Sequence, residues 1–487
     1  MRVLLASSEL HPYSKTGGLA DMVAALGKYL AKAGHEVSVF TPLYRGVRES
    51  AEAAGMTATD ARVEIPLAGR LVTGNLHVLR PQRRLTVYFV EQDGLFDRDG
   101  VYDQRLPHGR VAYADNFLRF VFFSRAVVQW MRDLELRPQI VHGHDWQTGL
   151  MPLLVRHRGW YEGWEEVPKS VFTIHNLGYP GRAAGREYAL TGLPAYYFHP
   201  EACEYYGDVN PLKAGIVFAD AITTVSPRYA REITTPLFGA GLDGVLRSRQ
   251  SALTGILNGV DYEDWNTTSN PHLPHPYSVD AMDGKRLNKL ALQREVGLPE
   301  REEVPLFGTV SRLADQKGID LIVAALNDLF GEDLQYVLLG SGDELLEEAA
   351  KDLVARFPGK MAFVQGRNER LAHLIEAGCD FFVMPSRYEP CGLNQLYSLR
   401  FGTPPIVCAT GGLDDSVVDA REDETTANGI KFHESSVPAL AAALRKALAL
   451  YAAPEALAHY RRNGMQADFG WRRTVKSYVE LYRRLAG

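Results

Sequence analysis

R-V-L-L-A-S-S-E-L-H-P-Y-S-K-T-G-G-L-A-D-M-V-A-A-L-G-K-Y-L-A-K-A-G-H-E-V-S-V-F-T (residues 2–41) decides the fold. Two short apolar runs, Arg2–Ser8 and His35–Thr41, are typical of buried strands. Between them, apolar residues recur every three or four positions over Leu19–Lys32, which predicts a helix that ends at Gly34. A strand–helix–strand unit implies parallel strands with a right-handed crossover. The chain therefore begins as an α/β domain.

The rest of the first half is expected to extend this sheet. Alternating runs at 61–66, 74–79 and 85–91 lie between turn residues, and we interpret them as strands added to the first sheet. Helical character returns at 112–132. Buried strands are predicted at 140–144, 170–175 and 219–226.

A second α/β pattern follows the proline-containing stretch Asn266–Pro276, which we expect to be a linker. Strands are predicted at 304–310, 335–339, 361–365, 380–385 and 405–409, helices at 319–329, 344–357 and 368–377, and a mostly helical end at 436–485. This pattern indicates two doubly wound domains. Ligands of such sheets bind beyond the carboxyl ends of the strands. Two domains facing a central cleft would therefore suit a large or two-part substrate.

Composition narrows the range of possible functions and partners. The 487 residues include 53 Lys and Arg against 59 Asp and Glu, and the net charge of −6 disfavours nucleic-acid binding. The four cysteines have no C-x-x-C spacing, which disfavours a disulfide scaffold or a Cys-rich zinc site. We find no signal-peptide pattern, and no uncharged apolar stretch approaches the roughly 18 residues of a membrane span. We therefore expect a cytoplasmic protein with no nucleic-acid or membrane partner.

Two loops at predicted strand ends are suited to anions. S-K-T-G-G-L-A-D (14–21) places Lys15 and paired glycines at a helix start, where amides and the helix dipole attract phosphate. It matches neither the dinucleotide-binding nor the P-loop fingerprint. S-R-L-A-D-Q-K-G (311–318) places Arg312 and Lys317 around one loop, and such a pair would stabilise a diphosphate leaving group. Each loop is also compatible with an ordinary turn that carries solvated charges.

A third anion-suited loop is P-S-R-Y-E-P-C-G-L-N-Q (385–395). Gly392, Leu393 and Asn394 would present backbone amides at a helix start, and Glu389 could accept hydrogen bonds from sugar hydroxyls. The alternative is a helix-initiating turn in which the carboxylate favours the dipole. Cys391 has no evident general base, so we interpret it as structural.

Polar residues also follow other predicted strands. H-G-H-D-W-Q (142–147) contains Asp145, and T-I-H-N-L-G-Y (173–179) contains His175. The first could ligate a metal, but no further ligands stand at a supporting spacing, so we expect no metal and favour a sugar. G-I-L-N-G-V-D (255–261) runs a strand into a turn at Asn258, which could be only a turn. Together these features indicate a nucleotide-sugar glycosyltransferase.

The chain resembles the bacterial glycogen synthase and plant starch synthase family. The resemblance rests on motifs that occur in the family's order: K-T-G-G-L-A-D (15–21), H-D-W-Q-T-G-L (144–150), T-I-H-N-L-G-Y (173–179), G-I-L-N-G-V-D (255–261), V-S-R-L-A-D-Q-K-G (310–318), P-S-R-Y-E-P-C-G-L-N-Q-L (385–396) and T-G-G-L-D-D-S-V (410–417). It implies the GT-B fold: an acceptor-side domain over 1–262, a nucleotide-sugar domain over 263–469, and a C-terminal segment, 470–487, that returns to the first. It also implies transfer of glucose from ADP-glucose to the non-reducing end of an α-1,4-glucan, with retention at the anomeric carbon.

The resemblance assigns roles to residues. Lys15 and Gly18 would contact the donor phosphates, and Asp21 would lie near the acceptor. Asp145 and Asn258 would bind glucose hydroxyls. The backbone carbonyl of His175 would lie at the anomeric centre, and Arg312 and Lys317 would stabilise the leaving diphosphate. Glu389 would bind glucose hydroxyls and support the positive charge that develops on the ring. The backbone amides of three further residues would bind the phosphates or the sugar: Gly392, Leu393 and Asn394.

No enzyme nucleophile is evident, so we favour front-face transfer that rests on positioning and charge stabilisation, without metal or cofactor. Two positions depart from the family pattern. Arg367 stands where an aromatic platform for adenine is common, although an arginine plane can stack on a base. Phe96 stands where a tyrosine is common, which would remove a hydroxyl contact to the donor.

Three alternatives are less well supported. A UDP-glucose or sucrose-related enzyme would carry a second glutamate seven residues after Glu389, where this chain has Leu396. A glucan phosphorylase would need a lysine context for pyridoxal phosphate, and none is found. A catalytically silent glucan-binding protein is disfavoured because the charged donor-site positions are all present. The sequence does not define the oligomeric state.

Overall fold

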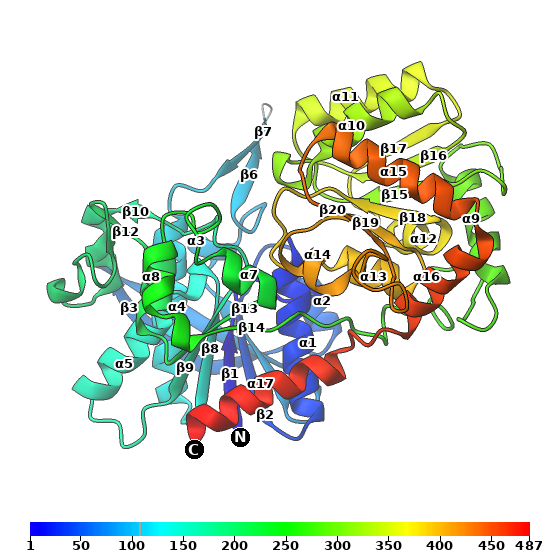
Figure 1. Cartoon of the computed structure of the whole chain (residues 1–487). Coiled ribbons are helices and arrows are strands. Elements are labelled where there is room, and N and C mark those ends of the chain that lie inside the picture. The colour runs from blue at the N-terminus through cyan, green and yellow to red at the C-terminus, as the bar shows by residue number, and fades with distance from the viewer. Residues whose placement is uncertain (107–108) are drawn as a thin grey trace. The chain divides into compact units, whose positions relative to one another are not determined.

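A computed structural model describes residues 1–106 and 109–487, which form two compact units (Figure 1). Unit 1 contains Met1–Ile256 and Trp471–Gly487, and unit 2 contains Leu257–Gly470. The boundaries expected after residues 262 and 469 lie a few residues from these. No helix of the described residues is long and apolar enough to cross a membrane.

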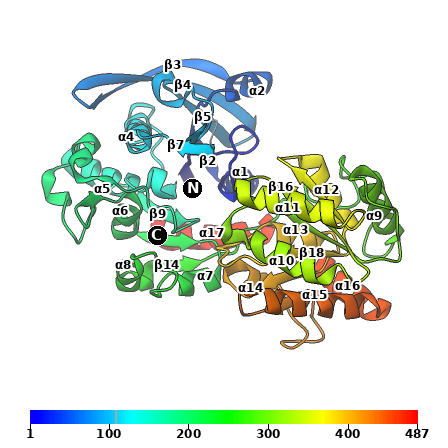
Figure 2. The ribbon, with the colours of Figure 1, turned by 90° about the horizontal axis from the view of Figure 1, so that it is seen from above.

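Unit 1 is built on a nine-stranded sheet in the order β14-β13-β9-β8-β1-β2-β5-β4-β3. Its strands are β1 (Arg2–Ala6), β2 (Glu36–Pro42), β3 (Thr57–Leu67), β4 (Arg70–Gln82), β5 (Leu85–Glu91), β8 (Ile140–His144), β9 (Lys169–Ile174), β13 (Ala221–Thr224) and β14 (Leu253–Gly255). β5 pairs parallel to β2, whereas β4 and β3 follow antiparallel at the outer edge (Figure 2). The predicted extension of the first sheet is confirmed.

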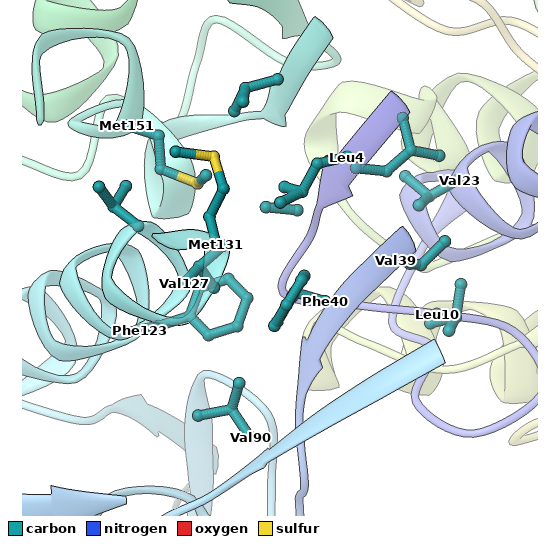
Figure 3. Packing of buried hydrophobic residues seen from close by; sticks show 14 of the residues in the cluster. Leu4, Leu10, Val23, Val39, Phe40, Val90, Phe123, Val127, Met131 and Met151 are labelled. Carbon is teal, nitrogen blue, oxygen red and sulfur yellow. The ribbon is translucent and has the colours of Figure 1, made fainter. Parts of the chain in front are cut away.

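Helices cover both faces of this sheet. They are α1 (Gly18–Lys32), α2 (Val47–Ala53), α3 (Asp93–Phe96), α4 (Asn116–Asp133), α5 (Met151–Tyr161), α6 (Pro211–Phe218), α7 (Pro227–Glu232) and α8 (Asp243–Ser248); short pairings add β6 (Asp103–Leu106) with β7 (Gly109–Ala112), and β10 (Ala183–Ala184) and β11 (Glu204–Tyr205) with β12 (Asp208–Val209). Successive side chains of a strand point to opposite faces. Phe40 of β2 accordingly points toward Phe123 and Val127 of α4, whereas Val39 lies near Val23 of α1 (Figure 3).

The C-terminal helix α17 (Trp471–Ala486) belongs to unit 1, as the resemblance implied (Figure 1). Trp471 stacks on Tyr29 of α1, with ring centroids 6.4 Å apart. Tyr482 lies 2.7 Å, hydroxyl oxygen to Nδ1, from His142 of β8. The last helix of the chain therefore completes the core of the first unit.

Unit 2 holds a six-stranded, wholly parallel sheet in the order β17-β16-β15-β18-β19-β20. Its strands are β15 (Leu306–Val310), β16 (Gln335–Gly340), β17 (Met361–Gln365), β18 (Phe381–Met384), β19 (Pro405–Cys408) and β20 (Ile430–Phe432). Its helices are α9 (Asp283–Glu295), α10 (Ile319–Leu329), α11 (Glu344–Arg356), α12 (Glu369–Gly378), α13 (Asn394–Arg400), α14 (Gly411–Ser416), α15 (Val437–Tyr451) and α16 (Pro454–Gln466). Separate apolar clusters cover the two faces, which confirms the predicted doubly wound domain.

The stretch 266–276 is part of unit 2, so the expected linker is wrong. Trp265, just before it, stacks between His373 and Tyr397, at centroid distances of 3.8 and 3.6 Å. Asn270 also contacts the His373 ring, with Nδ2 and Nδ1 2.9 Å apart. Just after it, Tyr277 donates a hydrogen bond to the Phe401 carbonyl. The prolines suggested a free segment, but the aromatic residues beside them anchor it.

Candidate active site

In unit 1, three neighbouring strands bring predicted site residues to one edge of the sheet. The loop with Lys15, Gly18 and Asp21 follows β1, Asp145 follows β8, and His175 follows β9. β1, β8 and β9 are consecutive parallel strands, so their carboxyl ends share one edge. This is the edge at which open α/β sheets bind ligands.

The loop after β1 is held by a carboxylate that the sequence analysis did not single out. Glu9 accepts hydrogen bonds from the backbone amides of Thr16 and Gly17 and from the Thr16 hydroxyl. Lys15 Nζ lies 2.9 Å from Asp21 Oδ1. The expectation that the paired glycines offer free amides to an external anion is therefore wrong for Gly17. The only sequence signal was a glutamate close behind a buried strand.

Asp145 adopts a backbone conformation that is rare for a residue with a side chain. Its φ is +56°, and such positions concentrate at functional sites. Its Oδ1 atom accepts hydrogen bonds from the amides of His175, at 2.7 Å, and Asn176, at 3.3 Å. Burial raises the pKa of the Asp145 carboxyl to about 7, and the charge of Glu9 adds to this effect, whereas the two amides oppose it. Asp145 therefore fixes the backbone of His175.

Three imidazoles lie side by side at these strand ends. His142 contacts Tyr482 through Nδ1 and Thr173 through Nε2, at 2.7 and 2.6 Å. His144 Nδ1 lies 3.1 Å from His175 Nε2. Burial lowers the pKa of His142 and of His175 to about 3, so both are neutral at physiological pH. Within the described ranges, no group of three or more His, Cys, Asp or Glu residues is placed to hold a metal ion.

In unit 2, the second and third predicted loops meet. β15 and β18 are adjacent parallel strands; Arg312 and Lys317 follow the first, and Glu389 follows the second. Lys317 Nζ donates a hydrogen bond to Glu389 Oε2, and the Ser386 hydroxyl donates to the same oxygen at 3.1 Å. The carboxylate is nearly buried, with 8% of its side chain exposed. Arg312 is exposed, and its guanidinium pairs with no residue that the structure describes.

Backbone contacts fix the two loops to one another. Gly318 has φ +66°, and a Cβ atom at this position would lie 2.4 Å from the Pro385 carbonyl oxygen. The Arg387 amide donates to the Gln316 carbonyl at 2.9 Å, and the Gln316 side chain donates to the Tyr388 carbonyl at 3.1 Å. Glycine is required here because both the left-handed backbone and the close approach exclude a side chain. The spacing of Lys317 and Glu389 is thereby set.

The remaining predicted residues of the third loop lie at the start of α13. Asn394, the first residue of α13, donates from Nδ2 to the Val310 carbonyl at 2.6 Å, which ties this helix to β15. Gly392 has φ +72°, and Leu393 is the N-cap residue of α13. Gly412, from a motif given no role, donates its amide to the Glu389 carbonyl at 3.1 Å.

Asn258 lies in unit 2. Its Oδ1 atom is buried and has no hydrogen-bond partner in the described part of the chain. Burial raises the pKa of the Cys391 thiol to about 12, so this group is no thiolate nucleophile at neutral pH.

The two departures from the family pattern differ in their surroundings. Arg367 is exposed and follows β17, two strands from β15 on the same sheet. Phe96 is fully buried, with the rings of Tyr44, Phe120 and Phe122 at centroid distances of 5.8, 6.5 and 6.4 Å. Phe96 therefore belongs to the core of unit 1.

Two doubly wound units with predicted site residues after their strands are typical of glycosyltransferases of the GT-B fold. Residues 2–248 match the starch synthase catalytic domain, and residues 293–465 match the glycosyl transferases group 1. The chain therefore belongs to the glycogen and starch synthase family.

Individual relatives cover the whole chain. A glycogen synthase of Syntrophotalea carbinolica is 44% identical over 99% of both chains, and one of an Anaeromyxobacter species is 46% identical over all of both. The catalytic domain of Arabidopsis thaliana starch synthase IV, solved with ADP and acarbose, has a TM-score of 0.90 and 32% identity, covering 100% of this chain and 99% of that one. A sucrose-phosphate synthase from Thermosynechococcus elongatus shares the fold at a TM-score of 0.62 and 20% identity, covering 99% of this chain and 98% of that one.

Proposed function

We propose that this protein is a retaining glucosyltransferase that moves glucose from ADP-glucose to the non-reducing end of an α-1,4-glucan and releases ADP. The names of its full-length relatives support this reaction, and the starch synthase structure holds ADP and acarbose. The structural observation that carries the proposal is the contact of Lys317 with Glu389, in a loop that also carries the exposed Arg312. It combines two cations for a diphosphate with a carboxylate for a sugar.

In unit 2, Arg312 and Lys317 would hold the diphosphate. An ammonium group has three donor hydrogens, so Lys317 can keep its bond to Glu389 and still donate to phosphate. Charge that develops on the leaving diphosphate would be stabilised without reorganisation of the loop. Glu389 would accept hydrogen bonds from glucose hydroxyls and favour positive charge on the ring. Gly392, Leu393 and Asn394 would offer amides to phosphate or sugar, Asn258 its side chain to glucose, and Arg367 its plane to the base.

In unit 1, Lys15 and Gly18 would contact the donor phosphates and Asp21 the acceptor. Asp145 would bind a glucose hydroxyl and hold the His175 backbone, whose carbonyl would face the anomeric carbon. The neutral imidazole of His175 adds no positive charge there. With no thiolate at Cys391, we favour front-face attack, in which the leaving phosphate accepts the proton of the acceptor hydroxyl. No step of this mechanism calls for a metal or a cofactor.

We also propose a cytoplasmic location. All four cysteines, Cys203, Cys379, Cys391 and Cys408, are free and buried. Free cysteines are typical of a reducing compartment.

Nucleotide release with each of two donors tests the proposal. The purified protein is incubated with ADP-glucose or UDP-glucose, with and without glycogen, and no metal is added. We expect glycogen-dependent release of ADP and little release of UDP. A preference for UDP-glucose would overturn the donor assignment, and no release from either donor would favour a silent glucan-binding protein.

A further inference from the structure

Glu9 is a buried carboxylate at the amino end of α1. It follows β1, and only 2% of its surface is exposed. Its carboxylate accepts hydrogen bonds from the Thr16 amide, the Thr16 hydroxyl at 2.6 Å, the Gly17 amide at 3.3 Å and the Tyr102 hydroxyl at 2.7 Å. Four donors from two segments of the chain therefore fix one carboxylate.

This carboxylate takes the place of a helix cap. The N-cap residue of α1 is Gly17, which has no side chain to bond the first amides of the helix. A negative charge at a helix start is favourable because the unpaired amides and the helix dipole carry partial positive charge there. Glu9 supplies that charge from eight residues upstream. The amides that a glycine-rich loop commonly offers to phosphate are thus partly occupied by the chain itself.

The Tyr102 side of this carboxylate is also fixed. The Tyr102 hydroxyl has one proton, which it donates to Glu9, so the Ser8 hydroxyl donates to the Tyr102 oxygen across 2.7 Å. Tyr44 in turn donates to the Ser8 carbonyl at 2.9 Å. These hydrogen bonds orient the Glu9 carboxylate. The carboxylate in turn holds the Lys15 loop through Thr16 and Gly17.

We propose that Glu9 is a positioning residue for glucose transfer. The inference rests on the proposed function. By binding the amides of Thr16 and Gly17, Glu9 holds the loop so that Lys15 faces the donor phosphates. The donor then takes no amide from Thr16 or Gly17. Glu9 itself touches neither donor nor acceptor and acts through Lys15.

Glu9→Gln tests this role while preserving side-chain size. A glutamine that keeps its carbonyl oxygen on the two amides must turn its NH₂ group to the hydroxyls of Thr16 and Tyr102, which donate to Glu9. Both hydroxyls would have to become acceptors, and the negative charge at the helix start is lost, so the anchor of the loop is weakened. We expect kcat/KM for ADP-glucose to fall about 100-fold, the loss that a displacement of about 1 Å can cause. Amide hydrogen exchange should accelerate at residues 16 and 17. Because Glu9 acts through Lys15, Glu9→Gln combined with Lys15→Ala should be no slower than Lys15→Ala alone.

A purely structural role of Glu9 would not produce this non-additivity. A control variant separates a positioning role from a structural one. Asp220→Asn alters a carboxylate that also accepts an amide and a hydroxyl, both from Ser170, but at the amino end of β13. We expect it to leave kcat/KM unchanged.

Several results would overturn the proposal. The first is a Glu9→Gln protein with wild-type kinetics. The second is a loss of kcat/KM in Glu9→Gln that adds to the loss in Lys15→Ala, and the third is an equal loss of kcat/KM in Asp220→Asn.

If Glu9→Gln does not fold, Tyr102→Phe is the variant to test, because it removes one of the four hydrogen bonds to Glu9. We expect kcat/KM of Tyr102→Phe to fall about tenfold, and wild-type kinetics would refute the role. Wild-type protein that releases no ADP would refute the proposed function instead.

Discussion

Lys317 Nζ donates a hydrogen bond to Glu389 Oε2, which joins the loop after β15 to the loop after β18. Both side chains are largely buried, with 18% and 8% of their surfaces exposed. A buried pair of this kind adds little net stability because both ions lose hydration. Its arrangement at the carboxyl ends of adjacent parallel strands instead matches the needs of a donor site. We therefore expect the pair to serve catalysis more than folding.

Removing the ammonium group of Lys317 should impair turnover. Lys317→Ala is expected to lower kcat about 100-fold, because the leaving diphosphate loses a preorganised positive charge. Lys289→Met is a matched control, since it breaks another buried pair of unit 2, with Asp380 at 2.7 Å, before the amino end of β18. The control should lower the melting temperature and leave kcat unchanged. Equal kcat losses in both variants would contradict the assignment.

Arg312→Ala separates binding from stability. The side chain is exposed and pairs with no described residue, so we expect the melting temperature to stay within about 1 °C, as for an isolated surface substitution. Loss of a bidentate phosphate contact should lower kcat/KM for ADP-glucose about 100-fold. Arg462→Ala, another exposed arginine of unit 2, serves as the control. An Arg312→Ala enzyme with wild-type kinetics would exclude Arg312 from the donor site.

Gly318→Ala tests how the loops are held together. The substitution adds a Cβ atom 2.4 Å from the Pro385 carbonyl and places alanine at φ +66°, so we expect a loss of about 1–3 kcal/mol in unfolding free energy. Because the loop carries Lys317, KM for ADP-glucose should rise as well. Gly331→Ala, where a Cβ atom meets nothing within 4 Å, should change neither quantity. Denaturant unfolding and initial rates measure both effects.

The buried imidazole of His142 should make stability depend on pH. Burial lowers its pKa to about 3, so the unfolded chain binds a proton near pH 6.5 that the folded chain rejects. Its contribution to stability is therefore present above pH 6.5 and is lost as the pH falls, by about 2 kcal/mol at pH 5.

His142→Gln isolates this effect. The variant is expected to show a flatter dependence of unfolding free energy on pH between 5 and 7 than the wild-type protein. Parallel curves would show that His142 does not titrate on unfolding.

The sequence predicted most of the fold because apolar runs and helical spacing are local signals. β8 and α10 match their predicted bounds, and β5 does as well. The signal failed where tertiary packing decides the structure. α9 was missed because it is largely polar, and two of its lysines, Lys285 and Lys289, are buried only through partners elsewhere in the chain.

The site was predicted unevenly for a related reason. Strand ends and charge spacing pointed to Lys317 and Glu389, and the sheet order brings them together. The positive φ of Asp145 and the hydrogen bonds that Glu9 accepts from its own loop depend on the three-dimensional path of the backbone, which residue type and spacing do not reveal. The stretch Asn266–Pro276 was predicted to be a linker because of its prolines, but it is anchored within unit 2.

Transfer of labelled glucose tests the central claim most directly. ADP-[¹³C₁]glucose and a defined maltooligosaccharide are incubated with the protein, and the anomeric carbon of the product is followed by NMR. We predict a new α-1,4-linked glucose at the non-reducing end, formed together with an equal amount of ADP. A β-linked product would contradict retention, and labelled free glucose without chain extension would contradict transfer to a glucan.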